Sequence, residues 1–407
     1  MAERSERLRA EALVMVDRQE ELRRRLEELG FDDVRFASTN PPLESVALKD
    51  WLSAGMHGEM GWMERTADKR NNPDQVLAGV KSVILLGVSY ADEKPAEGSH
   101  SHDPKRPIWA RYALHQDYHD TIKPALIRAG RCIEEIYGAV ESDYRYYVDT
   151  GPVLERSWAA RAGLGFIGKN AMLISRQHGN WLFLAAILTK LEFVPDPPIR
   201  KKVLPPEGAT GEDIGLLCGK CTRCLDACPT QAFARPGVVD ARRCISYQTI
   251  ENKSIIPREL RRGIGARIYG CDICLEVCPW NRFAHKGRSM LVTARRELAD
   301  VTLAEILQLT QERFAELFRG TAMKRVKLGG LVRNACIVAG NSGDGAFLPL
   351  LTRLAGHDLP LVRAHAVWAV YRLTERDAAA SLLLSYRENE NDAAVLREYA
   401  FEENPNN

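Results

Sequence analysis

The hydrophobic pattern divides the chain into an N-terminal part of mixed helices and strands and a C-terminal part of helices alone. Charged and apolar residues recur with helical spacing from Ser5 to Leu29, and the pattern ends at Gly30. This predicts an amphipathic helix. A second helix is predicted from Leu43 to Met63. Apolar runs predict four buried strands, at Ser82–Tyr90, Arg145–Val148, Ala171–Ser175 and Trp181–Thr189.

The same pattern predicts three domains. Strands alternating with helices make residues 1–205 an α/β or α+β domain, in which a turn at 178–180 joins the last two strands as a hairpin. A stretch rich in proline and glycine, Pro195–Gly215, predicts a linker before a cysteine-rich domain at residues 206–285. Residues 286–407 carry helical patterns, and Leu331-Val332-Arg333 recurs as Leu361-Val362-Arg363. This period favours a HEAT-like stack of helix pairs, with a plain helical bundle as the alternative.

Composition excludes several classes of protein. The 407 residues are 45% hydrophobic and 27% charged, which is typical of a folded chain. No apolar run approaches the ~20 residues of a membrane-spanning helix, and no apolar segment follows the charged N-terminus. We therefore expect a cytoplasmic protein without membrane contact. The net charge of +2 says little about partners, so any nucleic-acid surface must be local.

Cysteine is the most informative residue type. Eight of the ten cysteines lie in one segment, and only Cys132 and Cys336 stand apart. Without an export signal, such clustering indicates metal binding rather than disulfides. The run that begins at Cys218 has the spacing C-x2-C-x2-C-x3-C-P, which matches the bacterial ferredoxin run. Zinc sites usually separate their ligands into two distant pairs, so zinc explains this run poorly.

A second run begins at Cys271 and also ends in Cys-Pro, but Ile268 stands where its first cysteine would be. Cys244 supplies the missing ligand. The ferredoxin cross-over then predicts two 4Fe-4S clusters and an electron acceptor in the N-terminal domain. One cluster would bind Cys218, Cys221, Cys224 and Cys278, and the other Cys228, Cys244, Cys271 and Cys274.

Two motifs precede the cysteines. Gly163-Leu-Gly165-Phe-Ile-Gly168 has the form G-x-G-x-x-G, but it follows a predicted helix, Val153–Ala162, and precedes a strand. It is therefore not a dinucleotide site, and Gly163 is expected to end that helix in the left-handed conformation. Upstream, Asp149 and Thr150 follow a strand. Either residue suits a helix cap, and Asp149 beside aromatic residues also suits a proton donor with a raised pKa.

Together with the cluster runs, the stretches VDTGPVLERSWAARAGLGFIGKN and ARYALHQDYH resemble epoxyqueuosine reductases, and the likeness covers essentially the whole chain. The resemblance implies an iron-sulfur and cobalamin oxidoreductase that performs the last step of queuosine biosynthesis, reducing the epoxide of epoxyqueuosine in tRNA anticodons to the alkene. It implies a cobalamin-binding reductase domain, a ferredoxin-like two-cluster domain and a HEAT-like tRNA-binding domain. No D-x-H-x-x-G signature occurs, which fits base-off cobalamin binding in this family.

The resemblance also implies roles for individual residues. Asp149 would protonate the opening epoxide oxygen, and Arg156 would hold substrate or a phosphate. Electrons from an external low-potential donor would pass through the clusters to cobalamin, and both cobalt attack and direct electron transfer stay open. A solvated arginine and core leucines are the ordinary alternatives for some of the positions near cobalamin. These positions would be Arg70, Ala110, Asp149, Leu173, Leu184, Ser246 and Lys253.

A tRNA partner predicts a local basic surface. Five basic residues and no acidic one occur from Arg319 to Arg333, whereas eight acidic and three basic residues occur from Thr374 onward. We expect tRNA phosphates at the basic segment, with a solvated face as the alternative. The molecule is expected to be a monomer. Two other functions are a dehalogenase-like corrinoid reductase of a small molecule and a non-catalytic iron-sulfur scaffold. The basic residues expected to contact tRNA are Lys324, Arg325 and Lys327.

Overall fold

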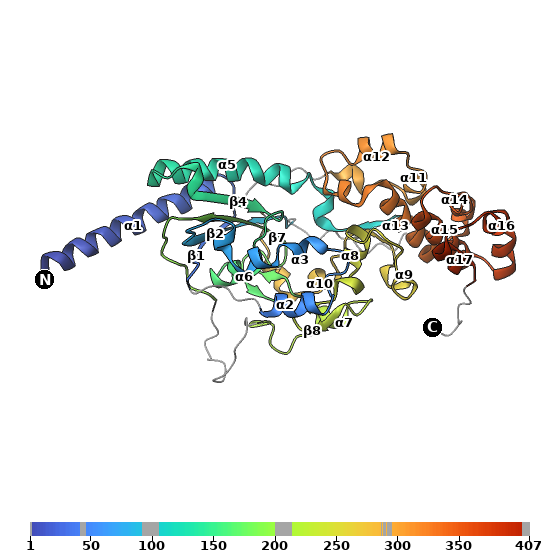
Figure 1. Ribbon diagram of the computed structural model, residues 1–407, viewed down its shortest axis with the longest axis horizontal. Helices are drawn as coiled ribbons and strands as arrows, with labels where there is room; N and C mark the ends of the chain where they lie inside the picture. The colour runs from blue at the N-terminus through green and yellow to red at the C-terminus, as the bar shows by residue number, and fades with distance from the viewer. Residues whose placement is uncertain are drawn as a thin grey trace.

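The computed structural model describes residues 2–40, 46–91, 106–199, 214–285, 287, 290 and 295–400. Parts of the expected helix 43–63 and of the expected linker 195–215 lie outside these ranges, as does the end of the chain after residue 400. A sheet lies toward one end of the molecule and the C-terminal helices at the other, with the cysteine-rich segment between them (Figure 1). In the described part of the chain, no helix combines the length and apolar character needed to cross a bilayer.

A four-stranded sheet forms the centre of the N-terminal part. Every neighbouring pair of its strands is antiparallel, so the arrangement is α+β. The strands predicted at 82–90, 145–148 and 181–189 are confirmed within a residue at each end. The strand order is β1 (Asp33–Ser38), β2 (Ser82–Ser89), β7 (Leu182–Thr189) and β4 (Tyr144–Val148), of which β1 was not predicted.

Helices cover both faces of this sheet (Figure 1). Along β2, Ile84 and Leu86 join the core beneath α1 and α5, whereas Val83 and Leu85 join the core beneath α6. Both faces are therefore dry, which explains why the central strands are continuous apolar runs rather than alternating ones. These helices are α1 (Ala2–Glu28), α5 (Tyr118–Tyr137) and α6 (Glu155–Arg161).

The single helix predicted from Leu43 to Met63 is wrong. Within the described residues, α2 (Val46–Ser53) and α3 (Gly61–Arg65) are separate and are followed by α4 (Ala67–Asn71). Between the first two, Gly55 and Gly58 have φ angles of +64° and +60°, which end a right-handed helix. The apolar residues have helical spacing in the sequence, but these two glycines interrupt the helix.

The predicted hairpin between strands 171–175 and 181–189 is also wrong. β6 (Leu173–Ile174) pairs with β5 (Phe166–Ile167), while β7 pairs with β2 and β4. A Cβ at Gly165 would lie 2.6 Å from the Ile174 carbonyl oxygen, so glycine lets these two short strands approach. Gly163, with φ of +73°, follows α6 as predicted. Leu173 and Leu184 therefore lie in different sheets.

The cysteine-rich segment consists of short elements. Cys244 is the N-cap residue of α8, and β10 pairs in parallel with β3 (Ile108–Trp109), which ties this segment to the N-terminal part. Its helices and strands are α7 (Arg223–Asp226), β8 (Phe233–Arg235), β9 (Val238–Val239), α8 (Ile245–Ile250), α9 (Arg258–Ile264), β10 (Arg267–Tyr269) and α10 (Ile273–Glu276).

In the C-terminal part, α15 packs against α13, α14 and α17. The two repeat copies begin in α13 and α15, and the apolar core around these helices continues into α8, α9 and β10. The α-helices are α11 (Leu303–Ile306), α12 (Gln311–Leu317), α13 (Lys327–Ser342), α14 (Leu348–Leu354), α15 (Pro360–Leu373), α16 (Arg376–Glu388) and α17 (Ala393–Tyr399). Single 3-10 turns occur at 73–75, 111–114, 141–143, 241–243, 279–283, 296–298, 322–326 and 345–347.

A fully buried arginine joins the last two parts. The Arg333 guanidinium on α13 donates hydrogen bonds to the carbonyl oxygens of Gln248, Asn252 and Ser254 at 2.8–2.9 Å. The neighbouring Asn334 amide donates to the carbonyls of Thr249 and Ile268. Burial lowers the pKa of Arg333 to about 10. These carbonyls replace water around the Arg333 charge. Residues 248–254, which follow Cys244, are therefore held against α13 of the helical part.

Replacing Arg333 by Ala should therefore destabilise the fold. Three carbonyls would lose their donor, and unsatisfied buried groups cost about 1–3 kcal/mol each. We expect urea unfolding to report a loss of about 3 kcal/mol or more. The matched control is Arg313→Ala, which removes an exposed ion pair with Glu316 and should cost less than about 1 kcal/mol. Equal stability of the two variants would contradict this role for Arg333.

Candidate functional site

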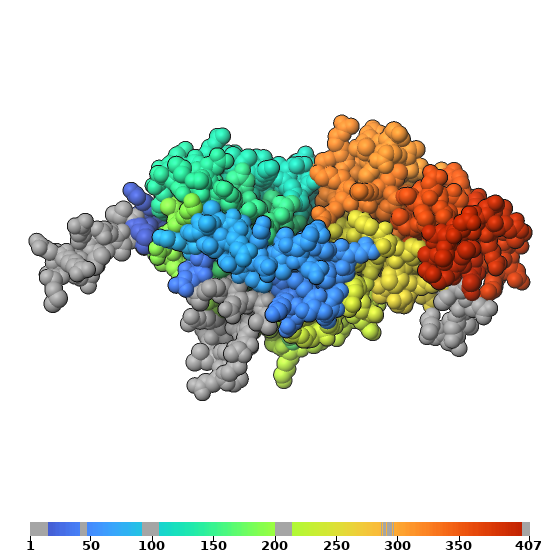
Figure 2. All heavy atoms as spheres, viewed as in Figure 1, coloured from blue at the N-terminus to red at the C-terminus, as the bar shows by residue number. Residues whose placement is uncertain are grey.

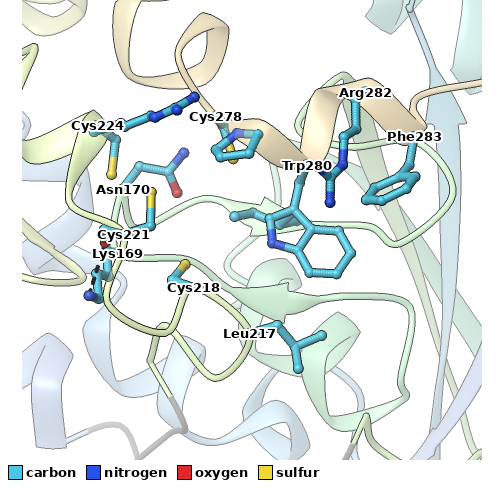
Figure 3. A pocket seen from close by; sticks show the side chains of 13 residues that line it. Lys169, Asn170, Leu217, Cys218, Cys221, Cys224, Cys278, Trp280, Arg282 and Phe283 are labelled. Atoms are coloured by element: carbon cyan, nitrogen blue, oxygen red, sulfur yellow. Dashed lines mark hydrogen bonds between the residues drawn. The ribbon is translucent and has the colours of Figure 1, made fainter.

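Four cysteines from both runs line one cavity of about 210 Å³ (Figure 3). They meet because α7 and α10, which each contain one cysteine of a run, pack against each other. The Lys169 ammonium donates to the carbonyls of Gly219 and Cys221, which holds the first cysteine loop against the sheet domain. The structure thus brings together the predicted first ligand set, Cys218, Cys221, Cys224 and Cys278.

The second predicted set is also brought together. Cys244 interacts electrostatically with Cys228, and Cys274 with both Cys271 and Cys244. Burial raises the pKa of the Cys271 thiol to about 12 and raises those of Cys244 and Cys274. Thiols in such surroundings ionise when a bound metal supplies the opposing positive charge.

The first cysteine group surrounds a cavity with room for more than one metal atom. Among the described residues, no three His, Cys, Asp or Glu side chains converge on a point that would hold a single ion. Four thiols around a cavity instead suit a multi-iron cluster, whose sulfides and irons fill the space between ligands. This geometry disfavours the zinc alternative.

Asp149 lies at an open corner of the sheet. β4 ends at Val148 opposite Ala185, so residues 182–184 of β7 have no β4 partner. Asp149 is exposed, has a φ of +58°, and accepts a hydrogen bond of 2.5 Å from the Tyr118 hydroxyl. The capping alternative for Asp149 and Thr150 is wrong, because Leu154 is the N-cap residue of α6.

Arg70 is buried next to this corner. Its guanidinium donates to the Thr66 hydroxyl at 3.0 Å and to the Val153 carbonyl at 2.9 Å. Burial lowers its pKa, while the charges of Glu155 and Asp149 act in the opposite direction. Arg70 is therefore not the solvated arginine that its sequence context allowed.

Glu155 is a site residue that the sequence analysis missed. Its Oε1 atom is buried without a hydrogen-bond partner, and burial raises its pKa to about 7. The charge of Asp149 raises this pKa further, whereas that of Arg70 lowers it. The available signal was an acidic residue at the start of a helix that directly follows Asp149.

The other residues expected near cobalamin differ in accessibility. Ala110 and Leu173 are buried, and a Cβ on Gly270 would lie 2.5 Å from that of Ala110. Leu184 and Ser246 are half-buried. Lys253 is exposed, with its ammonium donating to the carbonyls of Ile250 and Arg325, and burial lowers its pKa. Three of the five therefore have surface that a ligand can reach.

The residues of the expected basic surface have different surroundings. The Lys324 ammonium lies 2.8 Å from an Asp117 oxygen, and the Arg325 guanidinium pairs with Glu251. Lys327 is exposed. Because Arg333 is fully buried, its inclusion in a phosphate-facing run is wrong.

Arg156, expected to hold substrate or a phosphate, is exposed on α6. Its guanidinium donates to the carbonyl of Ala171 at 2.5 Å. The side chain is thus oriented by the loop that precedes β6 while its charge remains accessible to solvent.

Near this corner, segments from all three parts of the chain contact one another. The charge of Arg325, in the 322–326 turn, interacts with Asp149. Glu59, between α2 and α3, accepts hydrogen bonds from the Lys253 amide and the Ser254 hydroxyl, while its own amide donates to the Tyr247 hydroxyl. In Figure 2 the light blue surface of this N-terminal segment borders the yellow and green surface of the cysteine-rich segment.

Family profiles match two stretches of the chain. Residues 70–150 match the profile described as epoxyqueuosine reductase QueG, DUF1730, and residues 217–281 match a 4Fe-4S double cluster binding domain. The second match spans all eight clustered cysteines, so the segment is a double-cluster domain.

Whole-chain relatives agree with these profiles. The chain is 36% identical to epoxyqueuosine reductase from Vibrio cholerae over 86% of its length and 90% of the relative's, and 36% identical to that from Escherichia coli over 86% and 88%. A solved epoxyqueuosine reductase from Bacillus subtilis, with its catalytic aspartate loop swung out of the active site, superposes with a TM-score of 0.79, 29% identity and coverage of 95% and 98%. One bound to an epoxyqueuosine-modified tRNA-Tyr stem loop superposes with a TM-score of 0.78, 29% identity and the same coverage.

Replacing Cys244 by Ala tests the assignment of the eighth ligand. We expect the variant to lose the cluster that Cys244 completes and to keep the other, so iron should fall from about eight to about four atoms per chain. Iron analysis after anaerobic reconstitution measures this. Cys132→Ser, on α5 and outside both cysteine groups, should retain the full iron content. A full iron content in the Cys244 variant would refute the assignment.

Proposed function

Because this chain belongs to the epoxyqueuosine reductase family, we propose that it reduces epoxyqueuosine to queuosine in tRNA anticodons, with two 4Fe-4S clusters carrying the electrons and Asp149 donating a proton. The observation that carries the proposal is the position of Asp149 at an open sheet corner, where it accepts from the Tyr118 hydroxyl and where the charge of Arg325, which pairs with Glu251, also acts. The relatives are epoxyqueuosine reductases over most of the chain, so a small-molecule reductase is not favoured.

The reaction requires two electrons and two protons, because the epoxide oxygen leaves as water when the alkene forms. Asp149 is exposed at the corner, and Glu155, with a pKa of about 7, lies nearby as a second carboxyl group. A carboxylic acid that retains its proton near neutral pH can donate to a developing alkoxide. The Bacillus subtilis relative has its catalytic aspartate on a loop, as Asp149 is here.

The cysteine pairing proposed above defines an electron path. The set Cys218, Cys221, Cys224 and Cys278 would bind one cluster, and Cys228, Cys244, Cys271 and Cys274 the other. The second set lies next to the segment that leads to Tyr118, because the Asp272 carboxylate accepts from the Arg111 amide at 2.6 Å. We propose that an external low-potential donor reduces the first cluster and that electrons leave from the second.

Cobalamin fits the residues around Asp149. The buried Oε1 of Glu155 lacks a donor, and the amide groups around a corrin ring are donors. The end of β7 that β4 does not cover adds the half-buried Leu184, and Arg70, Ser246 and Lys253 would hold polar groups of the cofactor. Ala110 and Leu173, which are buried, would shape the wall of the cofactor site. When bound, cobalamin supplies a strongly reducing, nucleophilic cobalt centre.

The remaining expectations belong to the same proposal. Residues 1–205 would form the cobalamin-binding domain, 206–285 the cluster domain and 286–407 a HEAT-like domain that binds tRNA. The packing of α15 against α13, α14 and α17 supports stacking of helix pairs. Arg156 would contact substrate through its exposed guanidinium. A tRNA substrate supports a cytoplasmic location, and we propose that the enzyme acts there as a monomer.

Asp149→Asn tests the function and the proton donor together. Reduced wild-type enzyme incubated with epoxyqueuosine-containing tRNA should yield a nucleoside that has lost one oxygen atom, as measured by mass spectrometry. The variant should be slower by at least about 10²–10⁴-fold, because an amide cannot act as a general acid at neutral pH. Its iron content and its corrin absorption bands should remain. Unchanged turnover in the variant would show that Asp149 is not the proton donor. Absence of product with the wild-type enzyme would refute the proposed function.

Simultaneous replacement of Lys324, Arg325 and Lys327 by Ala tests the tRNA surface. Each lost phosphate contact should lower the slope of log affinity against log salt by about one. Fluorescence titration of tRNA at several salt concentrations measures both quantities. Replacement of Arg313 and Arg353, which are exposed on α12 and α14 outside the basic segment, is the control. Equal affinity and equal slope in the triple variant and the wild type would show that these residues form a solvated face and do not contact tRNA.

A further inference from the structure

We propose that Tyr118 is a positioning residue that holds Asp149 in its reactive orientation, and that Lys324 secures this arrangement through Asp117. The proposal deepens the function above and rests on Asp149 as the proton donor. It links the acid to the basic 322–326 turn through two consecutive residues at the start of α5, Asp117 and Tyr118.

Asp149 needs an external contact to stay in place. Its φ of +58° lies in the left-handed region, which residues other than glycine adopt rarely, and its exposed position provides little packing. Among the described residues, the Tyr118 hydroxyl donates a side-chain hydrogen bond of 2.5 Å to its carboxylate. That short bond fixes one oxygen, Oδ2, and leaves the other oxygen of the carboxyl group for a substrate.

Tyr118 is itself immobilised. Its ring is buried, stacks on Phe183 at a centroid distance of 4.3 Å and 15° between planes, and meets Tyr112 edge-on at 6.3 Å. Burial and the negative charge of Asp149 raise the pKa of Tyr118, so the hydroxyl keeps its proton and remains a donor. A rigid donor of this kind determines where the carboxyl group points.

Asp117 anchors Tyr118 to the basic turn. It is the N-cap residue of α5, where its carboxylate accepts from the His119 amide at 3.1 Å, and its own amide donates to the Gly320 carbonyl at 2.8 Å. The side chain is 2% exposed, and its Oδ2 lies 2.8 Å from the Lys324 ammonium. Burial acts to raise the Asp117 pKa, but hydrogen bonds from His119 and Lys324 outweigh it and lower the pKa well below its usual range.

Lys324 can contact Asp117 and a tRNA phosphate at the same time. An ammonium group has three donors, and 61% of this side chain is exposed, so Lys324 can bind a tRNA phosphate while it pairs with Asp117. Lys327 is exposed in the same region, but the described contacts do not join it to Asp117. Lys324 is therefore expected to influence the rate of the reaction as well as affinity, and Lys327 affinity alone.

Tyr118→Phe tests the hydrogen bond, since it removes only the hydroxyl. In single-turnover experiments with saturating epoxyqueuosine-containing tRNA, we expect the rate to fall at least about tenfold, with the Kd for tRNA, the iron content and corrin binding unchanged. The matched control is Tyr144→Phe, which removes a hydroxyl bonded to Glu134 between β4 and α5 and should react at the wild-type rate. A wild-type rate for the Tyr118 variant overturns the proposal.

A double-mutant cycle separates this proposal from the function on which it rests. If Tyr118 acts through Asp149, Tyr118→Phe should slow the wild type but not slow Asp149→Asn further. Equal slowing in both backgrounds would show that Tyr118 acts through the fold and would overturn the proposal. If Asp149→Asn alone reacts at the wild-type rate, the proton-donor assignment fails instead.

The link to the basic turn is tested by Lys324→Met against Lys327→Met. We expect both variants to raise the Kd for tRNA severalfold, and only Lys324→Met to lower the single-turnover rate at saturating tRNA, by about threefold or more. An unchanged rate for Lys324→Met would remove Lys324 from the positioning of Asp149 and leave it as a phosphate contact only.

Discussion

The buried contact between Arg333 and the carbonyls of residues 248–254 is the constraint on which the rest of the site depends. A guanidinium without water must have its donors satisfied, and here three backbone carbonyls of the cysteine-rich segment and the side-chain oxygen of Asn334 accept from it. Residues 248–254 lie shortly after Cys244 in the chain. Their contact with Arg333 therefore ties the position of this predicted cluster ligand to the helical part of the chain. The shared apolar core of α8, α13 and β10 reinforces the same contact.

The packing of α13 against the cysteine-rich segment also explains how the basic 322–326 turn reaches the sheet domain. Once α13 is held against α8, the turn before it lies beside Asp117 and Glu251, and its cations pair with those acids. Charges that read as a uniform basic run in sequence therefore differ in role. Arg333 stabilises the interior, Lys324 and Arg325 join segments, and Lys327 faces solvent. Arg325, remote in sequence, consequently brings its charge to the corner that contains Asp149.

Much of the fold was predictable where the signal is local. Continuous apolar runs identified β2, β4 and β7, and ferredoxin spacing identified both cysteine groups, because the closely spaced cysteines of one run share a cluster with the last cysteine of the other run. The break between α2 and α3 was missed, since glycine at Gly55 and Gly58 does not by itself reveal a positive φ. The partner of β6 was also missed, because a strand's own pattern does not specify which strand it pairs with.

The sequence by itself predicted the double-cluster ligands and the candidate acid Asp149 and showed the family resemblance, all of which depend on residue type and spacing along the chain. The tertiary structure alone decided that Arg333 is interior, that the Oε1 atom of Glu155 is buried without a hydrogen-bond partner, and that Tyr118 bonds to Asp149 across 31 residues. These properties depend on desolvation and on distances between segments remote in sequence. Such quantities exist only once the chain has folded, because the same side chains in an unfolded chain are all surrounded by water.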